Sequence, residues 1–176
     1  AVIYLFLRSI PATLIPALAI PVSIISTLTI LAALDYSVNV LTLLALVLAI
    51  GLVVDDAIVV LENIHRRIEM GEPPLLAANR GAKQVAFAVV ATTIVLIAVF
   101  LPISFLEGET GRLFREFGVA VAAAVMFSSF VALSLTPMLC SKLLVEQKKE
   151  SWFYRSTEFI FVKLASGYRL ALALAI

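Results

Sequence analysis

The chain has 176 residues, of which 62% are hydrophobic and 14% charged, and its formal net charge is +1. Soluble globular domains contain roughly 45–50% apolar and about 25% charged residues, so this composition excludes an ordinary soluble domain and favours a membrane protein. The single cysteine, Cys140, and the single histidine, His65, exclude an internal disulfide and a Cys- or His-rich metal site, and the small net charge gives no indication of nucleic-acid binding.

Four long apolar stretches with few or no charged residues predict four complete membrane spans. Each stretch is close in length to the roughly 20 apolar residues that cross a bilayer as a helix. In chain order, the spans are predicted at about residues 12–34, 41–62, 84–106 and 117–141. The connections between them are predicted to be a polar link at residues 35–39, a charged loop at 62–83 and a second polar link at 107–116.

The basic residues predict the orientation of these spans. One side of the membrane holds eleven of the 13 Lys and Arg residues, in the N-terminal segment, the 62–83 loop and the segment after residue 141. The other side holds only Arg112 and Arg115. Because cytoplasmic connections are enriched in Lys and Arg, the first side is predicted to be cytoplasmic. The second span then runs from outside to inside.

The two ends of the chain are apolar, so we expect a fragment of a longer protein with a partial span at each end. Residues 146–166 place apolar and charged side chains on opposite arcs of a helix, which predicts a helix on the cytoplasmic membrane surface. An amphipathic connector packed on protein is the alternative. Residues 167–176 are predicted to start a further span. The predicted fold class is all-α, a polytopic transmembrane helix bundle with four complete spans and two partial ones. Residues 1–145 hold the first partial span and the four complete spans.

Two adjacent acids, Asp55 and Asp56, lie about two-thirds of the way along the second span. An ionised aspartate at the centre of a membrane helix costs about 2.5 to 3.5 kcal/mol on insertion scales. Such residues usually face the interior of a helix bundle and mark proton or ion pathways. We therefore interpret the pair as a proton or cation relay. No residue in the chain is predicted to be catalytic.

Helical geometry indicates what surrounds each acid. Adjacent residues on an α-helix point about 100° apart, so the two carboxyl groups lie on different faces. Gly51 lies one turn above Asp55, while Ala45 and Ala49 lie above Asp56. Small residues allow a neighbouring helix to approach closely, which predicts a crowded internal interface. Two carboxyl groups this close titrate as a unit, as a proton carrier requires.

Alternatives to a relay are open. The two aspartates could form a structural pair that hydrogen-bonds neighbouring helices and keeps one protonation state. An intramembrane aspartyl protease is a poor fit, because no other span here contains an acid to face them. Every Lys and Arg lies at the end of a span, so a cationic partner for the acids is expected from outside this chain.

Other polar residues are weaker candidates. Glu62 and Asn63 lie at the cytoplasmic end of the aspartate span and are interpreted as an interfacial cap, with a proton exit as the alternative. The hydroxyl pairs in the third and fourth spans are interpreted as helix-packing groups; these are Thr92, Thr93, Ser128 and Ser129.

The segment LAIGLVVDDAIVVLEN, which carries both aspartates, resembles the fourth transmembrane helix of resistance–nodulation–division (RND) exporters, and most closely the hydrophobe/amphiphile multidrug efflux branch. Similar residues occur in the expected places elsewhere in residues 1 to about 145. They are Phe6, Leu7, Arg8, Ala12, Thr13, Leu14, Ile15, Pro16, Pro21, Gly108, Gly111, Arg115, Phe117, Leu135, Thr136, Pro137 and Cys140. Residues 146–176 resemble the family less specifically.

The resemblance implies a proton antiporter with no cofactor, powered by the proton motive force. In the family, a homotrimer in the inner membrane of Gram-negative bacteria exports hydrophobic compounds through large periplasmic domains, a periplasmic adaptor and an outer-membrane channel. Asp55 and Asp56 match the proton-relay acids of this family, whose lysine and threonine partners lie in a second half that this sequence lacks. Heavy-metal exporters usually carry a single acid here, so the pair favours organic substrates. An RND exporter of metals, lipids or polypeptides and a non-transporting scaffold or truncated remnant are the alternatives.

Overall fold

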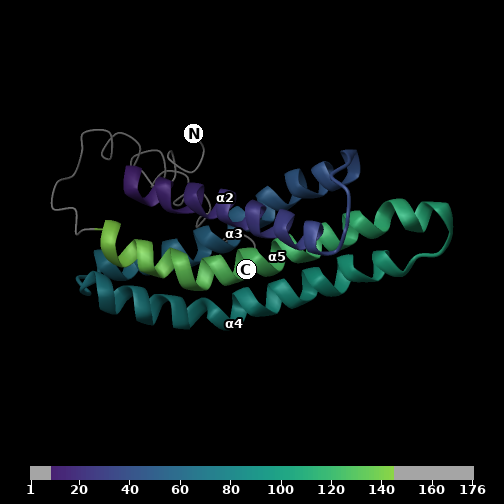
Figure 1. Ribbon diagram of the computed structural model, residues 1–176. Helices are drawn as coiled ribbons and strands as arrows, with labels where there is room; N and C mark the ends of the chain where they lie inside the picture. Colours follow the sequence, from purple (N-terminus) through teal and green to yellow (C-terminus); the bar gives the residue numbers. More distant parts are fainter. Residues whose placement is uncertain (1–8, 145–176) are drawn as a thin grey trace, which may run out of the picture. The chain divides into compact units, whose positions relative to one another are not determined.

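A computed structural model describes residues 9–144 of the chain, apart from the side chains of residues 109, 110, 112 and 113. The predicted partial span before residue 9, the surface helix at 146–166 and the further span at 167–176 lie outside this part. The described residues form four long α-helices and one short 3-10 helix, without a strand. In chain order they are α2 (Ile10–Ala33), α3 (Val40–Glu69), α4 (Pro74–Phe100), η1 (Leu101–Phe105) and α5 (Gly108–Leu143) (Figure 1).

The predicted all-α transmembrane bundle is confirmed. Four stretches are long and apolar enough to cross a membrane, one in each predicted span. They cover Ile10–Ala33, Val40–Glu69, Pro74–Phe105 and Phe114–Leu143. The end of the bundle that carries the connection between α3 and α4 is called the inner end below, and the opposite end is called the outer end.

Two of the three connections are shorter than the charge pattern predicts, while the first, at residues 34–39, agrees with the predicted link to within one residue. The 62–83 loop was expected from its charges and from its Gly and Pro residues, but only residues 70–73 of this segment lie outside a helix. Arg66 and Arg67 continue α3 because cations stabilise the last turn of a helix. Gly71 makes the turn with φ +89°, and Pro74 begins α4, where its missing N–H costs nothing. The outer link at 107–116 is likewise helical from Gly108 onward.

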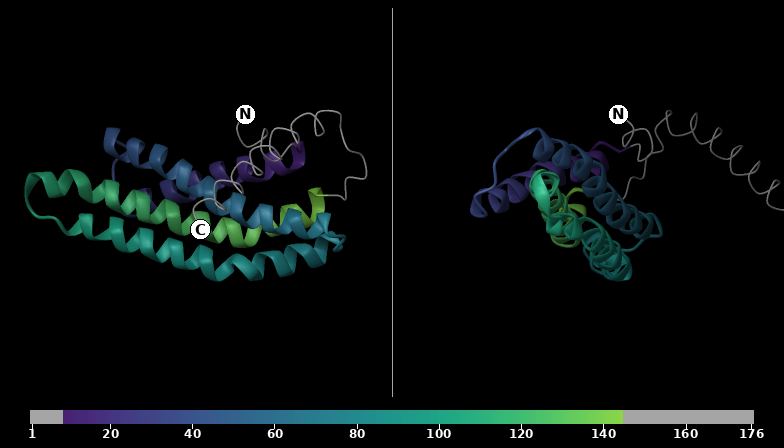
Figure 2. Two further views of the ribbon diagram at one scale, coloured as in Figure 1. Left: turned by 180° about the vertical axis from the view of Figure 1, so that it is seen from behind. Right: turned by 90° about the vertical axis from the view of Figure 1, so that its right-hand side faces the viewer.

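Helix α5 lies between the other helices of the bundle (Figure 2). It contacts α2, α3 and α4, whereas α2 and α4 make no direct contact within residues 9–144. Residues 120–125 of α5 are all buried, and four of these six residues are alanine. Small side chains let helix backbones approach closely in a membrane, where van der Waals packing and hydrogen bonds replace the hydrophobic effect.

At the outer end, a polar contact joins the start of α3 to α5. Asn39 caps α3, because its Oδ1 accepts hydrogen bonds from the backbone N–H groups of Leu41 (2.9 Å) and Thr42 (3.0 Å). The Asn39 side-chain amide also donates to Oε2 of Glu116, which accepts a second bond from the Ser37 hydroxyl at 3.2 Å. The cap of the aspartate helix is therefore held by the third turn of α5.

Candidate functional site

Asp56 faces the centre of the bundle. Its side chain is half-buried, and its Oδ2 accepts a hydrogen bond of 2.9 Å from the hydroxyl of Ser128 on α5. Ser128 is only 1% exposed, and its hydroxyl also lies 3.3 Å from the backbone carbonyl oxygen of Val53, one turn earlier on α3. One hydroxyl on α5 therefore has two acceptors on α3, a carboxylate and a carbonyl.

Asp55 points to a different side of α3. Its side chain is exposed, and within residues 9–144 no hydrogen bond or ion pair reaches its carboxylate. Residues above and below it on the same stripe of α3 are exposed as well; they are Leu44, Leu48, Gly51, Val59 and Glu62. This stripe is called the uncovered face of α3 below. The two acids therefore occupy different environments, as their 100° separation requires.

The small residues beside the acids also divide between the two faces. Ala45 is completely buried and packs with Leu31 of α2 and Val121 of α5, and Ala49 is 2% exposed. Gly51 instead lies on the uncovered face, where a Cβ atom would meet nothing within 4 Å. None of the described helices approaches Gly51 closely. The predicted close helix contact at Gly51 therefore stays a prediction and concerns a helix outside the described residues.

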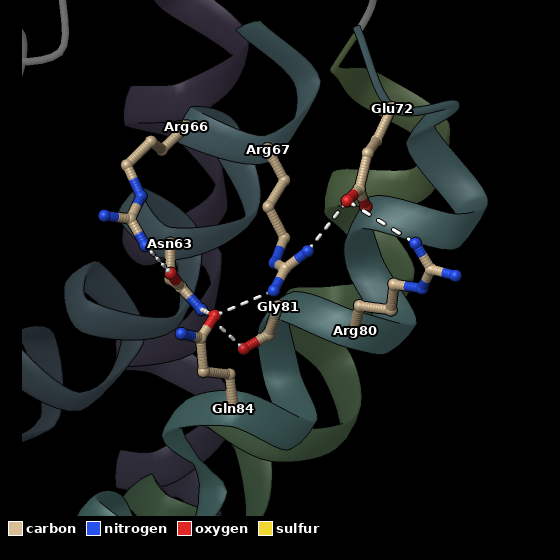
Figure 3. Close-up of polar contacts among 7 residues, drawn as sticks. All are labelled: Asn63, Arg66, Arg67, Glu72, Arg80, Gly81 and Gln84. Atoms are coloured by element: carbon tan, nitrogen blue, oxygen red, sulfur yellow. Dashed lines mark hydrogen bonds and ion pairs between the residues drawn. The ribbon is translucent and has the colours of Figure 1, made fainter. Parts of the chain in front are cut away.

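Asn63 is part of a polar cluster at the inner end, where α3 meets α4 (Figure 3). Its side-chain amide donates to the carbonyl oxygen of Gly81 at 2.8 Å and to Oε1 of Gln84 at 3.2 Å, both on α4. Its Oδ1 accepts a bond of 3.0 Å from Arg66. Glu62 is exposed on a neighbouring face of the helix, about 100° away. The two residues predicted as a cap or proton exit are thus separated, with Asn63 in the α3–α4 contact and Glu62 below Asp55.

Charged residues extend this inner-end cluster. Arg67 donates to Glu72 at 2.8 Å and to Gln84 at 2.9 Å, and Arg80 lies 3.6 Å from the same glutamate (Figure 3). Below them the backbones are close, because a Cβ atom on Gly81 would lie 2.8 Å from Cγ1 and 3.1 Å from Cα of Ile64. The inner end of the aspartate helix is therefore attached to α4 by both hydrogen bonds and tight packing.

Ser128 is the site residue whose role the sequence does not reveal. A serine in an apolar span reads as a packing group, and its partner lies 72 residues away, so no local pattern pairs them. The two threonines named with it behave differently. Thr92 and Thr93 donate to carbonyl groups of their own helix, at Val89, with 2.9 and 2.7 Å. Among the residues that the structure describes, no three His, Cys, Asp or Glu side chains gather to hold a metal ion.

Four membrane-crossing helices with a half-buried acid at their centre define a multi-pass α-helical membrane protein. The model of the AcrB/AcrD/AcrF family matches residues 1–176, and the chain belongs to this family of transporters in the RND superfamily. The resemblance to RND exporters that the aspartate segment indicates is thereby confirmed.

Proposed function

We propose that the chain supplies the proton-binding part of a proton-coupled exporter, in which Asp55 and Asp56 bind protons on one side of the membrane and release them on the other. The observation that carries this proposal is the Asp56–Ser128 hydrogen bond inside the bundle. Placing an acid at the centre of a membrane helix bundle costs free energy. Proton transfer is a function that explains why the acid is there.

The two acceptors of Ser128 supply a way to couple protonation to helix packing. An ionised Asp56 is an acceptor only, so the serine hydroxyl donates to it. A protonated Asp56 becomes a donor, and the hydroxyl is then free to accept from Asp56 and to donate to the Val53 carbonyl at 3.3 Å. Proton binding thus exchanges one hydrogen-bond arrangement between α3 and α5 for another, without leaving a buried group unpaired.

Asp55 has a different part in this proposal. Its carboxylate lies on the uncovered face of α3, within a predicted membrane span. An ionised aspartate exposed to lipid is costly, so a polar or cationic group from outside residues 9–144 covers it in the assembled protein. Release of this partner on protonation would let α3 move, and the movement would reach α4 through the Asn63–Gly81 contact.

The proposed cargo is a hydrophobic or amphiphilic compound, exported across the inner membrane at the expense of the proton motive force and without a cofactor. Family membership supports a homotrimer of the complete protein that works with a periplasmic adaptor and an outer-membrane channel. Metals, lipids or polypeptides as cargo, and a non-transporting scaffold, are the other possibilities that the tests below address.

Asparagine at either acid tests the proposal in the complete protein that carries this chain. Asp55→Asn and Asp56→Asn keep the size of the side chain but remove the titrating group. Export of hydrophobic dyes from cells that lack other pumps should fall to background, while the amount and oligomeric state of the protein stay unchanged. Glu69→Gln is the matched control, because it removes an exposed carboxylate near the end of the same helix, 3.6 Å from His65.

Three outcomes contradict different parts of the proposal. Dye export near the normal rate in both variants would exclude a proton relay at these acids. Loss of assembly together with loss of export would instead favour the scaffold, in which the aspartates hold helices together. If the unmodified protein made these cells resistant to metal salts but not to dyes, the relay would remain part of the proposal and the cargo would be a metal ion.

A further inference from the structure

A groove of about 400 Å³ lies at the outer end of the bundle, away from the two aspartates. It is formed by the link between α2 and α3, by η1 and by the N-terminal part of α5. Its lining residues are Tyr36, Leu101, Ser104, Phe105, Arg115 and Val119. Most of this lining is apolar, and Arg115 is its one charged member.

Arg115 is fixed at one of its nitrogens and available at the others. Its Nε donates to the carbonyl oxygen of Ser104 at 3.2 Å, and the Ser104 hydroxyl donates back to the Arg115 carbonyl at 3.5 Å. Within the described residues, no carboxylate lies within ion-pair distance of Arg115. The neighbouring acid, Glu116, is held instead by Ser37 and Asn39. The guanidinium group therefore presents a positive charge to the groove in a restrained orientation.

The level of the groove within the membrane identifies its environment. The membrane-crossing stretch of α4 and η1 ends at Phe105, and that of α5 begins at Phe114. From the length and apolar composition of these helices, we infer that the groove lies near the level where the hydrocarbon core meets the headgroups. Aromatic residues concentrate at this boundary. Tyr36 and Phe105 follow this pattern, and Phe105 is 76% exposed beside the groove.

We propose that this groove binds a phospholipid of the adjacent leaflet. The phosphate lies against the guanidinium of Arg115, whose planar donors match phosphate oxygens, and the first part of an acyl chain lies along Leu101, Phe105 and Val119. The positive charge above an apolar wall fits an anionic group joined to a hydrocarbon chain, and this combination is what a phospholipid offers at this depth.

The proposal can be tested in the complete protein with a photo-crosslinking residue. We would place p-benzoylphenylalanine at position 105 and reconstitute the protein into vesicles of phosphatidylglycerol and phosphatidylethanolamine that contain some diacylglycerol. Irradiation joins the probe to nearby acyl chains, and mass spectrometry identifies the adduct. We expect phospholipid adducts to be enriched over diacylglycerol adducts relative to the vesicle composition, because only phospholipids carry the phosphate that Arg115 contacts.

Two variants make this result specific. Arg115→Gln should lower the enrichment by about fivefold, as expected for one lost charge-assisted contact at a partly exposed site. Arg115→Lys should retain part of the enrichment, because it keeps the charge. The matched position is Phe87, which is 85% exposed on α4 but does not line the groove, and a probe there should show no dependence on Arg115.

Three results would overturn the proposal. A probe at position 105 that joins to protein instead of lipid would mean that another part of the protein covers the groove. Equal adducts of phospholipid and diacylglycerol would exclude recognition of the phosphate. Enrichment that persists in a correctly folded Arg115→Gln protein would exclude Arg115 as its cause. None of these readouts depends on proton coupling, so they are independent of the function proposed for the aspartates.

Discussion

The hydroxyl oxygen of Ser128 lies 2.9 Å from Oδ2 of Asp56 and 3.3 Å from the carbonyl oxygen of Val53. A single side chain of α5 thus contacts both the acid and the backbone of the helix that carries it. Because Ser128 is almost completely buried, water does not replace it easily if it is removed.

Ser128→Ala should therefore reduce export without abolishing it. Hydrogen bonds to charged groups contribute about 1.5–3 kcal/mol, so loss of this bond should weaken the contact between α3 and α5 by about that amount. The measurement is dye export from vesicles at a series of imposed pH gradients. Ser134→Ala is the matched control, since Ser134 is exposed and bonds only within its own helix, to Phe130. Equal export by the two variants would remove Ser128 from the mechanism.

Gly81→Ala should destabilise the contact between α3 and α4. The added Cβ would lie 2.8 Å from Cγ1 and 3.1 Å from Cα of Ile64, so the two helices must separate slightly. Overpacking of this kind typically costs about 1–3 kcal/mol. Thermal unfolding of the purified complete protein measures the effect, with Asn79→Ala on the exposed side of the same helix as the control. An unchanged unfolding temperature would show that the helices are not packed this tightly.

The two arginines that contact Glu72 should differ in importance. Arg67 lies 2.8 Å from the glutamate with a side chain 23% exposed, and it also bonds Gln84. Arg80 lies at 3.6 Å and is 58% exposed. Arg67→Ala should lower the free energy of unfolding by about 1–3 kcal/mol, and Arg80→Ala by less than about 1 kcal/mol. High salt should abolish the effect of Arg80→Ala but not that of Arg67→Ala. Unfolding of both variants at low and high salt tests the ranking, and a larger loss from Arg80→Ala would reverse it.

Gly51→Leu tests the uncovered face of α3. Residues 9–144 leave open space at this glycine, but the exposed Asp55 beside it requires a polar neighbour in the membrane. We expect the larger side chain to impair assembly or export of the complete protein, because it would push that neighbour away. Val95→Leu, on an exposed part of α4, should have no effect. If Gly51→Leu is also harmless, this face meets lipid and Asp55 needs another explanation.

The number and position of the spans could be predicted from the sequence, because a membrane core excludes charge over a fixed length. The ends of the helices could not. Outside the membrane, charge no longer decides where a helix stops, and α3 continues to Glu69 because Arg66 and Arg67 are compatible with its last turn. The expected charged loop is therefore mostly helix.

The environment of the acids was only partly predictable. Their separation onto two faces follows from helix geometry, and the small residues above Asp56 indicate the side that packs. Their hydrogen-bond partners could not be predicted, because this would require knowing which helices pack together and which residues lie at the same depth. For this reason Ser128 was interpreted only as a packing residue, and Asn63, whose amide reaches Gly81 of the next helix, was interpreted as an interfacial cap.

Helix α3 is one uninterrupted element of 30 residues, with a length of about 45 Å at 1.5 Å per residue. It can therefore act as a lever with Asp56 near its middle. A tilt of about 5° around Asp56 would displace the helix end at Glu69 by roughly 1.7 Å, since about 20 Å separate the two residues. A shift of this size is comparable to the helix displacements of about 1–2 Å that accompany switching in other proteins. A tilt caused by protonation of Asp56 would therefore displace α3 most near its two ends. There, Asn39 and Asn63 connect α3 to α5 and α4.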